Sequence, residues 1–200
     1  MHIALHKPRG YSCSHNRGEA PVLDELLPPA LRECGLQPVG RLDRDTSGLL
    51  ILTTDGRLNH ALTCPANKVE KQYRIGFRGV LSATAAASVA AGIQIEGDPE
   101  PTLPAQLVVE RVTRFRSAVC EEELGEATLV LREGRHHQVR RMFRALRANV
   151  VTLHRERIGG IVLPPGLVVG DFVELPADAR FVEPADSAAR SCPVAVGGLA

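Results

Sequence analysis

The sequence has no long apolar run and no export signal. Its apolar stretches fall well short of the roughly 20 residues that a membrane-spanning helix needs. The first ten residues, MHIALHKPRG, are too polar for a secretory signal peptide. We therefore expect a cytoplasmic protein with no membrane association.

Paired cysteines and clustered metal ligands are also missing. The five cysteines are scattered without a C-x-x-C pair, which predicts reduced thiols and no disulfide framework. Adjacent His136 and His137 have no second group of ligands at a suitable spacing, so we do not expect a zinc site.

Overall charge is close to balanced, with a formal net charge of +1, so bulk charge does not indicate a nucleic-acid-binding protein. The distribution is more informative, because Arg132–Arg157 contains eight arginines and only two glutamates, whereas the sequence from Asp171 onward is net acidic. Such a local excess of positive charge is compatible with a phosphate-binding surface in a near-neutral protein.

The 200 residues suffice for one domain or two closely packed lobes. Strand-like segments outnumber helical ones without a regular βαβ alternation, which predicts an α+β fold with a mixed, largely antiparallel sheet. We expect one domain over 1–176 and a C-terminal tail over 177–200, where Ala, Pro and Gly dominate. The expected strands are 2–6, 47–54, 70–77, 93–95, 105–112, 114–120, 127–131, 150–153, 158–163 and 172–175, and the main expected helices are 57–62, 82–91 and 137–147.

A charged segment, Gly40–Gly48, lies directly before the buried strand expected at 47–54. If this segment is extended, Arg41, Asp43 and Asp45 project to the same side. A carboxylate beside a guanidinium stays ionised and can act as a nucleophile. The same residues also suit a turn in which the aspartates cap loop amides.

The expected helix at 137–147 has an apolar face and an arginine face. Val139, Met142, Phe143 and Leu146 follow the i, i+3, i+4, i+7 spacing of a core-facing stripe. The arginines of the other face repel one another by roughly 0.2–0.5 kcal/mol per pair, and no acidic residue within the helix relieves them. An external polyanion that offers phosphates would relieve them, although solvated arginine faces are also common. The arginines of this face are Arg140, Arg144 and Arg147, with Arg141 adjacent.

Tyr73 lies on the strand expected at 70–77, between Lys71 and Arg74. A tyrosine in this setting can stack on an RNA base or pass a proton. Strand tyrosines also commonly serve only in packing.

Five motifs follow one another in a fixed order over about 5–175. Together they resemble the RsuA/RluB/RluE/RluF family of ribosomal RNA pseudouridine synthases, and the last two motifs are most similar to the RsuA branch. The motifs are Lys7-Pro8-x-Gly10-Tyr11, Gly40-Arg41-Leu42-Asp43-x-Asp45-Thr46-x-Gly48-Leu49, Glu70-Lys71-x-Tyr73, Glu133-Gly134-Arg135-x-His137-Gln138-Val139-Arg140-Arg141-Met142-Phe143 and Leu153-x-Arg155-x-Arg157-Ile158-Gly159-Gly160.

The resemblance implies a pseudouridine synthase fold with flanking helices, a central active-site cleft and no cofactor or metal. It identifies Asp43 as the catalytic aspartate, Tyr73 as the tyrosine against the target base, and Arg140 as the basic residue that pairs with the aspartate. Leu153 matches an apolar residue of the base pocket. The remaining expected substrate-binding residues are Arg41, Arg135, His137, Gln138, Arg141, Arg144, Arg147, Arg155 and Arg157.

The RsuA-like motifs imply that the partner is 16S ribosomal RNA, free or within a ribosome assembly intermediate, and we expect a monomer. Family members usually carry a small S4 domain before the catalytic domain, which is not expected here because the motifs begin at Lys7. Three alternatives remain: a 23S RNA synthase like RluE, a non-catalytic RNA-binding or ribosome-assembly factor on the same fold, and an unrelated hydrolase that uses Asp43 and Asp45.

Overall fold

The computed structural model describes residues 1–13, 21–116, 121–176 and 181. The chain divides into two compact units: the first unit combines Met1–Val69 with the segment from Arg155 onward, and the second unit is Glu70–His154. Within the described ranges, no helix has both the length and the apolar character to cross a membrane.

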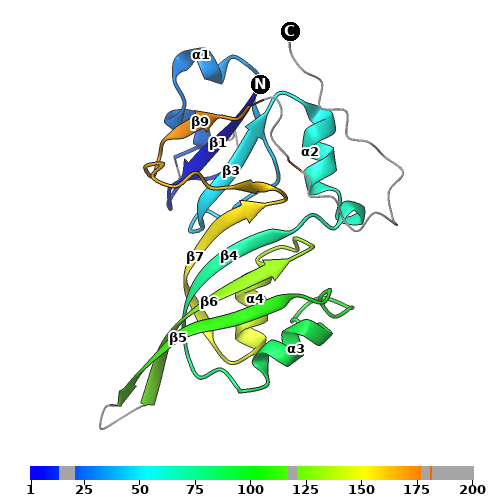
Figure 1. The fold of residues 1–200 in the computed structure, drawn as a ribbon, viewed down its shortest axis with the longest axis vertical. Helices are drawn as coiled ribbons and strands as arrows, with labels where there is room; N and C mark the ends of the chain where they lie inside the picture. The colour runs from blue at the N-terminus through cyan, green and yellow to red at the C-terminus, as the bar shows by residue number, and fades with distance from the viewer. Residues whose placement is uncertain (14–20, 117–120, 177–180, 182–200) are drawn as a thin grey trace. The chain divides into compact units, whose positions relative to one another are not determined.

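The sheet of the first unit is built around β1 (His2–Lys7). This strand pairs antiparallel with β3 (Ser47–Thr53) on one side and with β9 (Phe172–Glu174) on the other (Figure 1). A two-residue strand, β2 (Gln37–Pro38), pairs with β3. The expected buried strand is confirmed, because every residue of β3 after Ser47 is buried.

Helix α2 (Gly56–Thr63) follows β3 and packs on the first unit's core. The Asp55 side chain caps it by accepting hydrogen bonds from the N–H groups of Arg57 and Leu58 at 2.8 and 3.3 Å. Leu58 and Leu62 then point into the apolar cluster. The short helical turns of this unit are η1 (Leu23–Leu26), α1 (Pro29–Arg32) and η2 (Pro65–Asn67), and its buried cluster contains Ala4, Val39, Leu49, Ile51, Leu58, Leu62, Val69, Ile158, Ile161 and Phe181.

Phe181 belongs to this core, although the sequence analysis placed it in the tail. Its side chain is 2% exposed, and its carbonyl accepts a hydrogen bond from the N–H of Gly160 at 3.3 Å. The packed part of the chain therefore extends past the predicted boundary at residue 176. The rest of the predicted tail, 177–180 and 182–200, lies outside the described residues.

Strand β7 (Asn149–Ile158) is longer than expected and runs from the second unit into the first. After the turn at Gly159–Gly160, β8 (Ile161–Val162) pairs back onto β7. The strand predicted at 150–153 covers only part of β7. Side chains from Leu153 onward alternate between buried and half-buried, so the strand continues to Ile158.

The second unit has the strand order β5 (Gln106–Arg116), β6 (Glu121–Leu131), β4 (Lys71–Arg78) and the first part of β7. The two strands predicted over 105–120 are one strand up to Arg116, and 117–120 lie outside the described residues. Residues 108–114 are all exposed, so burial imposes no apolar alternation there from which the continuity of the strand could be predicted. The strand predicted at 93–95 is wrong: these residues are partly buried but join no strand.

Two helices, α3 (Ala85–Ala91) and α4 (Gln138–Ala145), complete the second unit (Figure 1). Three of the four residues of the predicted apolar face of α4 are buried, Val139, Met142 and Phe143, and the ring of Phe143 lies 5.6 Å from that of Phe77. The fourth, Leu146, follows the last residue of the helix and is half-buried. The observed elements and the antiparallel pairs of β1, β3, β4, β5, β6 and β9 confirm the α+β class.

Candidate functional site

The segment that carries Asp43 is a turn and not an extended strand. The N–H of Thr46 donates to the carbonyl of Asp43 at 3.0 Å, so the chain reverses through Arg44 and Asp45. The condition under which Arg41, Asp43 and Asp45 would align by strand alternation is therefore not met, and the alternative interpretation as a turn is the one observed. Asp43 is half-buried, whereas Arg41 and Asp45 are exposed.

A buried ammonium group holds this turn in place. The Lys7 side chain is 0% exposed, and its Nζ donates to the carbonyl of Thr46 at 2.9 Å and that of Pro8 at 3.0 Å. It also reaches the carbonyls of Asp43 at 3.2 Å and Arg44 at 3.4 Å. In the sequence Lys7 is only the first residue of a motif, but a lysine that ends an apolar strand is a signal for such a role.

The electrostatics of Lys7 show which charges lie near it. Burial lowers its pKa below the usual 10.5, since removal from water disfavours the ammonium. The influence of Cys13, Asp45 and Asp43 raises this pKa, and that of Arg155 lowers it. Lys7 therefore belongs to one electrostatic cluster with both aspartates of the turn.

Two further contacts fix the segment around Asp43. The N–H of Leu42 donates to the Sγ of buried Cys13 at 3.4 Å. The turn also exchanges hydrogen bonds with Gly10, whose N–H donates to the carbonyl of Arg44 at 2.7 Å while the Nε of Arg44 donates to the Gly10 carbonyl at 3.1 Å. The residues on both sides of Asp43 are thus anchored through the backbone. Cys13, Cys34 and Cys64 are free thiols, and Cys120 and Cys192 lie outside the described residues.

Arg155 is inside the first unit and not on its surface. Its side chain is 2% exposed, and its Nε donates to the carbonyl of Leu49 on β3 at 2.8 Å. The backbone of Arg155 lies against Gly48, where a Cβ atom would come within 2.6 Å of the Arg155 nitrogen. This position argues against the expectation that Arg155 binds RNA phosphates and favours a structural role. Arg157 is half-buried and donates to the carbonyl of Gly159 at 3.0 Å.

Three of the expected site residues lie in the second unit. Tyr73, on β4, is 9% exposed, and Leu153, on the neighbouring strand β7, is 4% exposed. Arg140 is half-buried on α4, and its NH1 donates to the carbonyl of Val150 at 3.3 Å. The second unit therefore contains Tyr73, Leu153 and Arg140, and the first unit contains Asp43.

The side chains of Arg135 and Arg141 bind the protein's own loop at 96–103, and that of Gln138 binds Glu133. Asp98 accepts from Arg135 at 3.0 Å and from Arg141 at 2.8 Å. Arg135 also contacts Glu133 at 3.1 Å, and Gln138 donates to the same glutamate at 2.6 Å. These contacts favour a structural role for all three residues, which the sequence analysis had assigned to the substrate. Further acceptors of the two arginines are the carbonyls of Glu96, Glu100, Pro101 and His136.

Asp98 makes the stability of the second unit sensitive to acid. Its pKa lies below the usual 3.8, because Arg141 and then Arg135 donate hydrogen bonds to the carboxylate. The stabilisation by these ion pairs is fully present above pH 3.8 and is lost as the pH falls through the lower folded-state pKa. We expect the urea midpoint of the Asp98→Asn variant to depend less on pH than that of the wild type between about pH 5 and about pH 2. Equal pH dependence in both proteins would contradict the role of Asp98.

Arg144, Arg147 and His137 remain at the surface of the second unit. The side chains of Arg144 and Arg147 have no hydrogen bond or ion pair within the described ranges, and both are exposed. The helix ends at Ala145, so Arg147 lies beyond it, in a left-handed conformation with φ +63°. The predicted arginine face of α4 therefore includes Arg140 and Arg144 but not Arg147. His137 precedes the helix, also with positive φ, and its exposed ring stacks on that of His136 at 3.8 Å.

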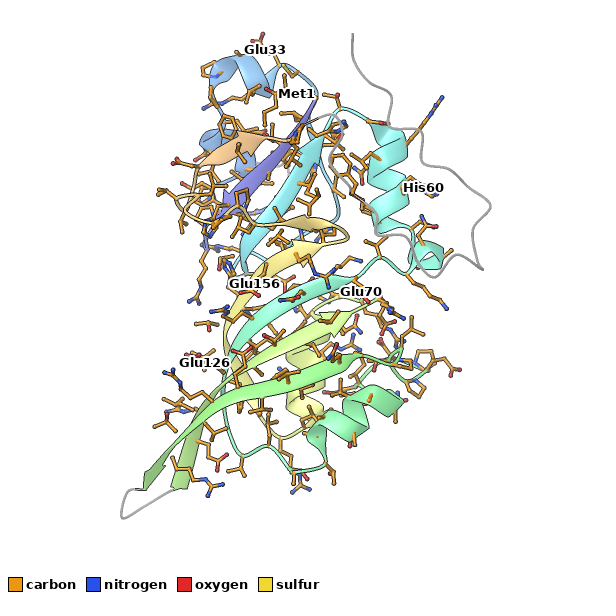
Figure 2. All side chains as sticks on the ribbon, in the orientation of Figure 1. Met1, Glu33, His60, Glu70, Glu126 and Glu156 are labelled. Carbon is orange, nitrogen blue, oxygen red and sulfur yellow. The ribbon has the colours of Figure 1, made fainter. Side chains whose placement is uncertain are left out.

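Glu70, next to the start of β4, and Arg132 form an ion pair and do not belong to the candidate site residues. Glu70, labelled in Figure 2, accepts from the Nε and NH2 of Arg132 at 3.2 and 2.9 Å. Within the described ranges, no three His, Cys, Asp or Glu side chains come together in a way that suits a metal ion.

The sequence matches the RNA pseudouridylate synthase family over residues 1–145. The "Ribosomal small subunit pseudouridine synthase A" of Vibrio cholerae is 40% identical over 174 residues, which cover 86% of this chain and 68% of the relative. The protein of the same name from Escherichia coli strain K12 is 38% identical over 173 residues, with the same coverage of each chain.

Solved structures agree with this match. One described as "Crystal structure of pseudouridylate synthase" superimposes with a TM-score of 0.76 at 35% identity, covering 88% of this chain and 70% of the other. Human RNA Pseudouridylate Synthase Domain Containing 1 superimposes with a TM-score of 0.55 at 16% identity, covering 84% of this chain and 81% of the other. The latter similarity concerns the fold alone, and together these structures confirm the pseudouridine synthase fold.

Proposed function

Because the chain belongs to the RNA pseudouridylate synthase family, we propose that it isomerises a uridine of 16S ribosomal RNA to pseudouridine. The observation that carries the choice of RNA is the 40% identity to a small-subunit enzyme over 86% of the chain. The substrate is the RNA itself or a ribosome assembly intermediate in the cytoplasm, and the protein acts as a monomer.

The reaction exchanges one bond for another within a single nucleotide. The bond from uracil N1 to ribose C1′ breaks, the base turns, and a bond from C5 to C1′ forms while the C5 proton leaves and N1 gains a proton. The target uridine must first leave the base stack and enter a pocket of the enzyme. No external electron donor or acceptor is needed, so the proposal includes no cofactor.

Asp43 is the residue to which we assign bond cleavage. Its carboxylate either attacks the nucleotide or removes a sugar proton, and both routes need a fixed position. The backbone contacts of Lys7 to the Asp43 turn supply that fixed position. Tyr73 and Arg140 act with Asp43 on the target uridine, and Leu153 provides apolar surface for the base, as the family resemblance implies.

The RNA backbone is held by exposed cationic side chains. Arg41, Arg144 and Arg147 are exposed and remain candidates for phosphate contacts. His137 is exposed beside the start of α4 and is assigned to the RNA as well. Arg157 is half-buried, so we assign it only a minor contribution to the RNA contact.

Replacing Arg144 and Arg147 together by alanine is expected to weaken RNA binding several-fold. The slope of log affinity against log salt concentration should decrease by about one for each phosphate that no longer binds an arginine. Binding titrations at several salt concentrations measure both quantities. Arg111→Ala, which removes one exposed arginine from β5, is the control and should change neither. An unchanged salt slope in the double variant would remove these arginines from the interface.

The function is tested by mapping pseudouridines in 16S and 23S RNA after incubation with the protein. Unmodified transcripts and partly assembled particles are the substrates, and light scattering during the assay reports the oligomeric state. A new site in 16S RNA supports the proposal. A new site only in 23S RNA would keep the reaction and overturn the choice of RNA. No new site in any substrate would favour a binding factor without activity.

A further inference from the structure

The turn that carries Asp43 presents main-chain N–H groups away from the protein interior. The carbonyls of Pro8 and Asp43 both point at the Nζ of Lys7, at 3.0 and 3.2 Å. In a trans peptide the N–H points opposite to the C=O, and the described residues contain no cis peptide. The N–H groups of Arg9 and Arg44, which follow these carbonyls, therefore point away from the buried ammonium.

Neither of these two N–H groups has an acceptor within the described ranges. Both residues are exposed. The guanidinium of Arg9 makes no hydrogen bond or ion pair there, and that of Arg44 uses only its Nε, on the carbonyl of Gly10. Each residue thus offers a main-chain donor and guanidinium donors that the described part of the protein does not use.

The two residues are held in a fixed relation to each other. The paired hydrogen bonds between Gly10 and Arg44 join the turn of Arg9 to the turn of Asp43. The buried Nζ of Lys7 also connects the two turns, because it donates hydrogen bonds to the carbonyls of Pro8 and Thr46. The main-chain N–H groups of Arg9 and Arg44 are therefore positioned before any ligand arrives, which lowers the entropic cost of binding.

We propose that Arg9 and Arg44 form a phosphate subsite that binds the RNA backbone at the target nucleotide. The inference rests on the proposed function, because the ribose on which Asp43 acts carries a phosphate on either side, and Arg44 is the next residue after Asp43. A main-chain N–H together with a guanidinium group is a typical set of anion-binding donors, and Arg9 and Arg44 each supply both. Arg9, Arg41 and Arg44 carry three positive charges, which outnumber the two negative charges of Asp43 and Asp45.

Arg9→Ala is the sharpest variant, because Arg9 makes no side-chain contact within the described ranges that the change would break. It is expected to weaken binding of the RNA substrate several-fold and to lower the salt slope by about one. KM should rise more than kcat falls, since the chemistry of Asp43 is untouched. Arg44→Ala should weaken binding at least as much, because it also removes the hydrogen bond to the Gly10 carbonyl. Arg44→Lys should recover only part of the affinity, because it keeps the charge but loses the guanidinium donors.

Arg57→Ala is the matched control, since Arg57 is an exposed arginine of the first unit on α2. It should leave affinity, salt slope and KM unchanged, and thermal unfolding should be the same for all variants. If the wild type forms pseudouridine and Arg9→Ala and Arg44→Ala both keep its affinity and salt slope, the subsite is wrong while the function stands. If both variants lose affinity and salt slope on an RNA that the wild type binds without modifying, the subsite stands and the proposed function is wrong.

Discussion

Asparagine in place of Asp43 is expected to lower the rate of pseudouridine formation by at least about 10³-fold, the scale seen when a group that makes or breaks bonds is removed. Asparagine has nearly the same shape, but it is neither a nucleophile nor a base. RNA affinity should change only a few-fold, because Lys7 holds this turn through main-chain carbonyls that the substitution keeps. Single-turnover rates and equilibrium binding to the same RNA measure the two effects separately.

Asp171→Asn is the matched control for this substitution. Asp171 is an exposed aspartate of the first unit, and its main-chain carbonyl accepts from the N–H of His6 at 2.9 Å. The variant should turn over like the wild type. If Asp43→Asn keeps a comparable rate, Asp43 is not the catalytic residue. If it loses RNA binding in parallel with the rate, the carboxylate serves binding instead.

The sequence predicts the fold best where one face of an element is buried. Apolar patterns that the core demands locate β3 and α4, and both are present with the expected residues buried, except that Leu146 lies just past the end of α4 and is half-buried. The prediction of strands failed where burial does not impose an alternation of apolar and polar residues. Residues 108–114 of β5 are all exposed, and Ile93 and Ile95 are buried without joining a strand.

The identity of the candidate site residues came from motifs, whereas their surroundings required the structure. Charge counting treated all arginines after residue 131 as equivalent. Arg135 and Arg141 contact Asp98, which lies more than 30 residues earlier in the chain. Arg155 is covered by the packing of β7 against β3. Contacts between segments that are distant in the sequence decide which arginines remain available for RNA. The spacing of residues along the chain cannot reveal these contacts.

Lys7→Met is expected to destabilise the protein by about 2–4 kcal/mol. Methionine fills a similar length but leaves the carbonyls of Pro8 and Thr46 without their donor, and no other donor reaches either carbonyl within the described ranges. Each buried carbonyl left unsatisfied costs about 1–3 kcal/mol. Relief from burying an ammonium group offsets part of that cost. Urea unfolding at neutral pH measures the difference, and Lys68→Met, at an exposed lysine, is the control and should change little.

The pH dependence of stability separates the Lys7 ammonium from simple packing. Because burial holds the pKa of Lys7 below its usual 10.5, the unfolded chain binds more protons than the folded protein between the two pKa values. Lys7 therefore adds to the free energy of unfolding as the pH rises through this window, and Lys7→Met should lack this increment. The variant should also lose kcat at a pH and temperature where it remains folded, because the Asp43 turn has lost its anchor. Wild-type kcat together with a wild-type pH profile would show that Lys7 neither positions Asp43 nor titrates in this way.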